Sequence, residues 1–190
     1  MPYGDEENIT ARRAAQVRSK LDIAKEVELG QYLYSFKTRP FPALHFSMVV
    51  PEQMDEFSAE ALVVKYPSQF RPQIILTVPD GSFDLSLQRM EKEPVQPEGI
   101  MEMVQTLRMA AKRMNPSAVY APVDWIDADI PAACFESWVD LFDGEIWQMT
   151  FGASIKGVLL MGGFCAPKEQ SQSWSVLARQ MIETLHILPD

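Results

Sequence analysis

The stretch KYPSQFRPQIILTVPDGSFDLSLQ, residues 65–88, decides the fold of this 190-residue chain. The run 73–78 is rich in β-branched residues and predicts a buried strand, and the run 82–88 alternates apolar and polar residues like a strand with one buried face. Between them, Pro79-Asp80-Gly81 supplies the preset φ of proline and the positive φ that glycine accepts in a tight turn. The sequence therefore predicts a β-hairpin. The residues expected in its core are Phe83, Leu85 and Leu87, and those expected in water are Ser82, Asp84, Ser86 and Gln88.

An approach segment, KYPSQFRP at 65–72, leads into this hairpin. Its two prolines favour extended backbone in the residues before them and so stiffen the segment. It carries two aromatic rings and a cation, Tyr66, Phe70 and Arg71. Because aromatic residues and arginine often dominate interface energetics, these three residues predict a binding surface. The alternative is structural: the two rings cover one end of the core, and Arg71 pairs with a nearby carboxylate.

The motif Lys65-Tyr66-Pro67, followed by Arg71-Pro72 and an apolar strand and turn, resembles members of the PsbP/Mog-like superfamily, and in particular a bacterial branch of it. The motif lies in 65–77, and the order of predicted elements is similar over 28–188. The resemblance implies an α+β fold of PsbP-like type, with an antiparallel β-sheet sandwiched between helices. It implies no catalytic residues, since such folds mostly serve as binding or assembly modules.

Composition narrows the class of protein. The length suits one domain, and an apolar fraction of 47% is enough for a sizeable core. The formal net charge of −9 argues against nucleic acid or an anionic membrane as the main partner, because both attract basic surfaces. No apolar run reaches the length of about 18 residues that a membrane-spanning helix needs. We expect a helical arm over 1–27, with four basic side chains in its helix at 9–21, and a single domain over 28–190.

The amino-terminal stretch lacks the apolar core of a signal peptide. The two cysteines, Cys134 and Cys165, fall in predicted strands and form neither a Cys-x-x-Cys motif nor a zinc-binding cluster with histidine. We therefore expect a cytoplasmic protein with two reduced thiols, no cofactor and no bound metal.

Hydrophobic periodicity predicts the other elements. Helices are expected at 9–21, 56–65, 98–114 and 169–188, and strands at 28–37, 44–50, 118–126, 133–142, 145–153 and 158–166. Two-residue turns are expected at Asp143-Gly144 and Lys156-Gly157. The run 158–166 is apolar on both faces and predicts a central strand covered on both sides. In it, Gly162 and Gly163 permit a ring or a helix to approach closely.

No phosphate-binding loop, nucleophile elbow or HExxH motif is present. The acidic residues of 124–145 lack the spacing of a calcium loop and are better explained as solvated connectors. A nucleophilic pair of Cys134 or Cys165 with His45 or His186 would need these residues to meet in the fold.

Two functions remain. The favoured one is a cytoplasmic, non-enzymatic protein-binding or assembly module that uses Tyr66, Phe70 and Arg71, with another protein or a second copy of the chain as partner. The alternative is a small-molecule-binding protein or minor hydrolase, with a pocket near Tyr66, Arg71 and the Gly162-Gly163 strand.

Overall fold

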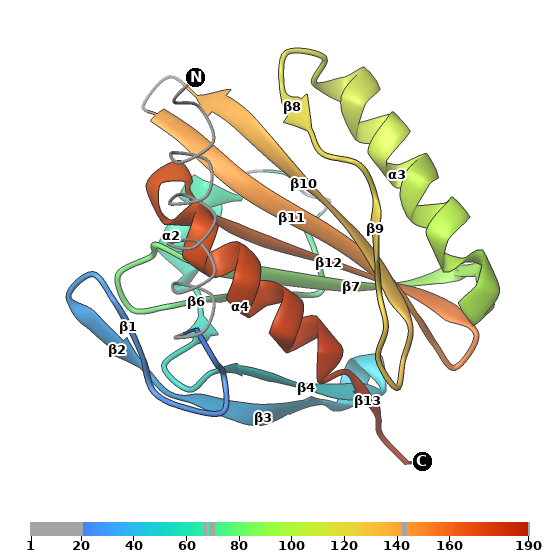
Figure 1. Ribbon diagram of the computed structural model, residues 1–190, viewed down its shortest axis with the longest axis horizontal. Helices are drawn as coiled ribbons and strands as arrows, with labels where there is room; N and C mark the ends of the chain where they lie inside the picture. Colours follow the sequence, from blue (N-terminus) through green and yellow to red (C-terminus); the bar gives the residue numbers. More distant parts are fainter. Residues whose placement is uncertain (1–20, 67, 69–70, 142–143, 190) are drawn as a thin grey trace, which may run out of the picture.

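The computed structural model describes residues 21–66, 68, 71–141 and 144–189. Its main feature is an eight-stranded sheet with the order β5-β6-β7-β12-β11-β10-β8, in which β9 also pairs with β10 (Figure 1). The long central strands pair antiparallel. The strands are β5 (Asp55–Glu56), β6 (Ile74–Thr77), β7 (Asp84–Pro94), β8 (Val119–Tyr120), β9 (Asp124–Ile126), β10 (Ala132–Leu141), β11 (Gly144–Ile155) and β12 (Val158–Pro167).

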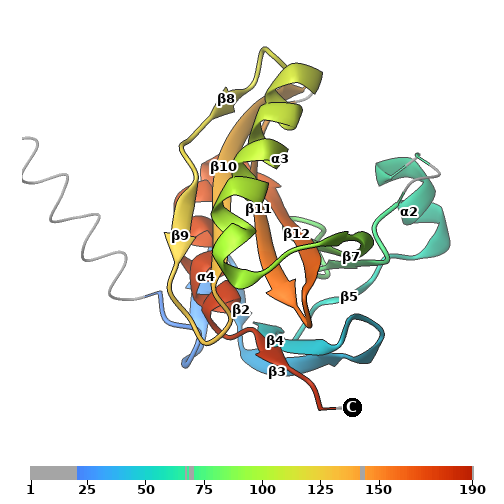
Figure 2. The same ribbon diagram turned by 90° about the vertical axis from the view of Figure 1, so that its right-hand side faces the viewer.

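Helices lie on both faces of this sheet. Helix α4 (Ser171–Glu183) crosses one face, next to a small sheet of β3 (Phe36–Phe41), β4 (Phe46–Pro51) and β13 (His186–Ile187) (Figure 1). Helix α3 (Ile100–Met114) covers part of the opposite face, and the short helix α2 (Ala59–Lys65) stands apart from it (Figure 2). The predicted α+β architecture, an antiparallel sheet between helices, is confirmed. No helix in the described part of the chain is long and apolar enough to cross a membrane.

The predicted hairpin forms and packs against the closing helix. Strands β6 and β7 pair from Ile74↔Leu87 to Thr77↔Asp84, and Gly81 in the turn has φ +70°. The ring of Phe83 stacks on that of Trp174 in α4, with centroids 3.7 Å apart and planes 4° from parallel. Phe83, Leu85 and Leu87 are fully buried, as the alternation predicts. Asp84 was expected in water but is also buried, because the end of α2 folds over it.

Several other elements follow the prediction. Helix α2 begins after Ser58, whose hydroxyl accepts a hydrogen bond from the Ala61 N–H at 3.2 Å. Helix α3 occupies most of its predicted range, preceded by a 3-10 turn at Pro97–Gly99. The turn at Lys156-Gly157 has positive φ at both residues, 52° and 75°, as a two-residue hairpin turn of the favoured type requires.

The amino-terminal strands differ from the prediction. The strand expected over 28–37 is a hairpin of β1 (Val27–Leu29) and β2 (Tyr32–Tyr34), because Gly30 adopts φ +63° and reverses the chain. Leu44, expected to begin a strand, lies in a 3-10 turn, and β4 starts two residues later. The predicted arm falls largely outside the described residues. Of its last part, Leu21 and Val27 belong to the core.

Three further predicted elements have different boundaries in the structure. The closing helix ends at Glu183 instead of 188, because the Thr184 hydroxyl accepts a hydrogen bond from the Val49 N–H at 2.8 Å and the chain then pairs with β4 as β13. His186 therefore lies in a strand. The strand expected over 118–126 divides into β8 and β9 around Pro122. Residue 141 pairs with Gly144, so Gly144 starts β11 and the connection falls on 142–143, outside the described residues.

Strand β12 is central in the sheet, but only one of its faces is covered along its whole length. On the α3 side, Leu159 is buried, whereas Met161, Gly163 and Cys165 are half-buried because α3 does not extend over them. The expectation of full cover on both sides is therefore wrong for this end of β12. On the covered face, Gly162 lies opposite Phe151, and a Cβ atom placed there would be 2.1 Å from the Phe151 ring.

This contact predicts that Gly162→Ala destabilises the protein while Gly163→Ala does not. An alanine Cβ at 162 would force the fully buried Phe151 ring to move, at a cost of about 1–3 kcal/mol. At 163 the nearest atom is the Ser86 Oγ, 3.0 Å away, which can rotate aside, so the expected change is below about 1 kcal/mol. Urea unfolding of the two variants measures both free energies. Equal losses would contradict the assigned faces of β12.

Candidate binding site

Helix α2 leaves two of its apolar side chains mainly in solvent. None of its residues is fully buried, and Val63 and Val64 are 58% and 82% exposed. It stands away from the sheet, on the side opposite α4 (Figure 2). A helix of seven residues is too short to be stable alone in water. Its position must therefore be fixed by contacts at its ends.

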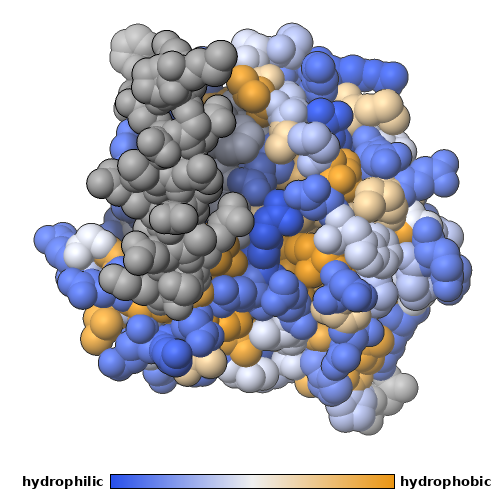
Figure 3. All heavy atoms as spheres, in the orientation of Figure 1, coloured by the Kyte–Doolittle hydropathy of each residue, from blue (hydrophilic) through white to orange (hydrophobic). Residues whose placement is uncertain are grey.

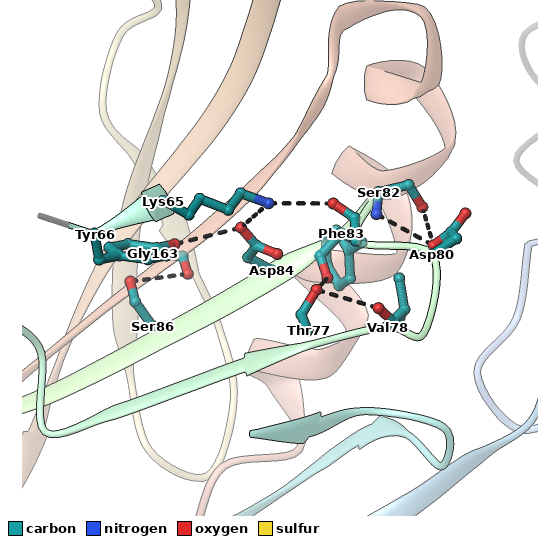
Figure 4. Close-up of polar contacts among 11 residues, drawn as sticks. Lys65, Tyr66, Thr77, Val78, Asp80, Ser82, Phe83, Asp84, Ser86 and Gly163 are labelled. Carbon is teal, nitrogen blue, oxygen red and sulfur yellow. Dashed lines mark hydrogen bonds and ion pairs between the residues drawn. The ribbon is translucent and has the colours of Figure 1, made fainter. Parts of the chain in front are cut away.

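The carboxyl end of α2 is held by Asp84 on β7. The Lys65 ammonium lies 2.7 Å from Asp84 Oδ2 and also donates a hydrogen bond to the Gly81 carbonyl at 3.1 Å. The Tyr66 hydroxyl donates to the same Asp84 oxygen at 3.3 Å (Figure 4). Asp84 is only 1% exposed, and its Oδ1 accepts no hydrogen bond from the described residues. A buried carboxylate with one paired oxygen is costly unless its cation stays in place, so this contact fixes the end of α2.

A cavity of about 360 Å³, here called the Tyr66 cavity, lies between this end of α2 and the sheet. Ser86, Gly163 and Thr150 form one row of its floor, because they are register partners on β7, β12 and β11. A groove of about 150 Å³ shares this row and continues past Pro72. The cavity is lined by Lys65, Tyr66, Asp84, Ser86, Leu141, Ile146, Gln148, Met149, Thr150, Gly163, Phe164 and Cys165.

The titratable groups of the cavity are poorly placed for catalysis. Burial raises the pKa of the Cys165 thiol to about 11, and the Asp84 carboxylate acts in the same direction, against Lys65 and a hydrogen bond from Gln148. Burial, followed by Asp84, also raises the pKa of Tyr66. At neutral pH both groups are protonated, and neither histidine is among the lining residues. The Cys–His pair that the sequence would require to meet in the fold is therefore not formed in this cavity, which holds no activated nucleophile.

Of the predicted site residues, Tyr66 and Arg71 are described, and they line different cavities. Tyr66 lies at the cavity and packs its ring edge-on against Phe57, with centroids 5.8 Å apart. Arg71 lies outside that cavity, beside a smaller one of about 140 Å³, and its Nε donates to the Ser68 carbonyl at 3.0 Å. No carboxylate of the described residues forms an ion pair with Arg71. Phe70 lies outside the described residues.

The acidic residues of 124–145 do not converge on a metal site within the described part of the chain. Glu136 accepts hydrogen bonds from Trp147 Nε1 at 2.7 Å and from Arg179 at 3.1 Å, and Arg179 also binds Asp124 at 2.9 Å. Glu145 pairs with Lys168. These acids are therefore partly structural and not only solvated connectors.

On the face that carries α4, the coloured surface is mainly hydrophilic, with apolar residues in small separate groups (Figure 3).

Comparison with known proteins identifies the fold. The chain is similar to the solution structure of cyanobacterial PsbP (CyanoP) from Synechocystis sp. PCC 6803, with a TM-score of 0.58 and 9% identity over 85% of this chain and 97% of that chain. A crystal structure from Bacteroides thetaiotaomicron VPI-5482 has a TM-score of 0.47 and 14% identity, covering 77% of this chain and 46% of that chain. No protein-family model matches the sequence, and no curated protein matches it significantly. The fold is PsbP-like, as the motif at 65–77 implies.

The environment of Cys165 predicts how the alkylation rate of its thiol depends on pH. With a pKa of about 11, its alkylation rate by iodoacetamide should rise about tenfold per pH unit from pH 7 to pH 10, as the thiolate fraction grows. Asp84→Asn should shift this curve to lower pH, since it removes the carboxylate and leaves Lys65 as an unpaired cation. Peptide mapping by mass spectrometry separates Cys165 from Cys134. The exposed Asp127→Asn is the matched control, and an equal shift in both variants would contradict the contact.

Proposed function

We propose that the chain is a non-enzymatic protein-binding module that recognises its partner through the α2 surface, defined as Val63, Val64, Tyr66 and Arg71. The observation that carries this proposal is that α2 buries none of its residues while it presents two adjacent valines to solvent. Apolar side chains exposed together on a projecting element are typical of interaction sites. Tyrosine and arginine beside them are the residue types that most often contribute binding energy.

The chemistry of the Tyr66 cavity supports binding in preference to catalysis. Its thiol and phenol both have raised pKa values, so neither is a nucleophile or a base at neutral pH. The likeness to PsbP supports the fold alone, and fold does not determine function. The non-enzymatic assignment therefore rests on these side chains.

Charge indicates the chemistry of the partner. The chain carries a net charge of −9, but Arg71 has no ion-pair partner among the described residues. An arginine in this setting favours a carboxylate on the partner and orients it. We infer a partner segment that has apolar side chains next to an acidic residue.

We place this activity in the cytoplasm, which the two unpaired cysteines, Cys134 and Cys165, support. The motif of 65–77 supports membership of a bacterial branch of the PsbP/Mog-like superfamily. A second copy of the chain is the simplest partner to test. Light scattering of the purified protein would show a homodimer, and Val64→Asp should return it to a monomer.

Affinity capture from native cells tests the proposal with matched variants. Val64→Asp and Arg71→Ser should each lose the same captured proteins, because one introduces a charge into the apolar contact and the other removes the cation. Val119→Asp is the control, since Val119 is also exposed, at 65%, but lies on β8. Val64 and Val119 are exposed, so changes there should alter stability by less than about 0.5 kcal/mol. Arg71 is half-buried and donates to the Ser68 carbonyl, so Arg71→Ser should cost about 1 kcal/mol.

Quantitative mass spectrometry of the captured fractions gives the readout, and thermal melting confirms that each variant is folded. Capture that is unchanged by Val64→Asp in folded protein would refute the α2 surface. Equal losses in Val64→Asp and Val119→Asp would mean that added charge, and not this site, is responsible.

A further inference from the structure

We propose that the Tyr66 cavity receives a tyrosine side chain of the protein partner, with the ring against the apolar walls and the hydroxyl at the polar floor. This inference rests on the proposed function and names the anchor residue of the same interface. The juxtaposition behind it is structural: Lys65 and Tyr66 form the last turn and the cap of α2, and they are also the roof of the cavity.

The walls fit a ring. Leu141, at the mouth, is 48% exposed, and Ile146 is half-buried beside it. The Tyr66 ring closes the opposite side, next to Ser86 and Gly163 (Figure 4). The volume of about 360 Å³ lies at the lower end of the range for ligand pockets, which suits one large side chain better than an extended ligand.

The polar groups at the floor of the cavity favour a ring that carries a hydrogen-bonding group. The Thr150 hydroxyl forms no hydrogen bond with the described residues, and the Ser86 hydroxyl, which donates to the Gly163 carbonyl at 3.3 Å, keeps its own lone pairs as acceptors. An aliphatic or phenylalanine anchor would bury the Thr150 hydroxyl without a hydrogen-bond partner. A phenolic hydroxyl both donates and accepts, so it matches both.

The charges that line the cavity argue against a charged side chain as the anchor. Lys65 and Asp84 are the charged residues among those that line the cavity, and at 2.7 Å they neutralise each other. A carboxylate entering the cavity would lose its hydration without a free cation, and a lysine or arginine would have to share the single Asp84 carboxylate with Lys65. An uncharged aromatic residue with a polar tip avoids this cost.

Gly163 keeps the cavity open. A Cβ atom placed there would lie within 4 Å of the Ser86 Oγ and the Met149 carbonyl oxygen, and it would meet no apolar side chain of the described residues. A larger side chain at this position would therefore extend into the cavity and fill it. This allows Gly163→Leu to serve as a blocking variant, while Thr150→Val removes the hydroxyl with little change of shape.

The first experiment titrates the full chain with p-cresol, the side-chain analogue of tyrosine, and with toluene, which lacks the hydroxyl. Backbone amide NMR should show p-cresol shifting Thr150 and Gly163, with an affinity about fivefold to tenfold higher than that of toluene. Thr150→Val should reduce p-cresol to the level of toluene, and Gly163→Leu should abolish both. Equal affinities in the unaltered protein, or shifts centred elsewhere, would overturn the proposal.

The second experiment separates the anchor from the surface around it. Gly163→Leu should lose the same captured proteins as Val64→Asp, although position 163 lies on the sheet and not on α2. If Gly163→Leu retains them while Val64→Asp loses them, the protein-binding function stands and the tyrosine anchor is overturned. If p-cresol binds but neither variant changes capture, the cavity takes a free phenolic molecule and the proposed function itself fails.

Discussion

The position of helix α2 depends on the ion pair between Lys65 and the buried carboxylate of Asp84. Helix α2 has no apolar face packed on the core, so the usual source of helix stability is absent. Asp84 is rigid because its backbone pairs with Thr77 on one side and Cys165 on the other. The ion pair therefore ties the end of α2 to a fixed position on the sheet. Since Lys65 is 41% exposed, solvent screens the pair and reduces its contribution to stability below that of a fully buried one.

The open half of the sheet follows from how unequally the helices cover its two faces. Residues that alternate towards α4 are fully buried, from Leu85 on β7 to Phe164 on β12 and Met149 on β11. Towards the other face, α3 packs on Leu159 and on Gly152, where a Cβ atom would lie 2.7 Å from Val104. It leaves the row Ser86, Gly163 and Thr150 uncovered. The small and polar residues of this row are therefore suited to contact with something other than the chain's own core.

The sequence predicts the local elements well because their signals are local. Alternation at 82–88, the helical stripe of α3 and the Lys156-Gly157 turn each depend on neighbouring residues, and each is present. The burial of Asp84 has no such signal, because its partner Lys65 is 19 positions away and polar residues in a half-buried strand normally face water. The carboxyl end of α4 is mispredicted for a similar reason. The chain leaves the helix and pairs with the free edge of β4, and no pattern in 184–188 indicates this pairing.

The residues of the candidate site likewise divide into those that the sequence could indicate and those that it could not. Tyr66 could be selected because an aromatic ring in a proline-flanked segment is conspicuous, and it does lie at the cavity. Ser86 and Thr150 could not be selected, since a row across three strands requires the register of the sheet. The sequence also could not decide between a reactive and an inert thiol. A reactive cysteine needs a nearby cation that stabilises its thiolate. Here Lys65 is committed to Asp84, so burial and the carboxylate dominate and the pKa of Cys165 rises. The contact that fixes the end of α2 thus also engages the cation that would stabilise a reactive thiolate.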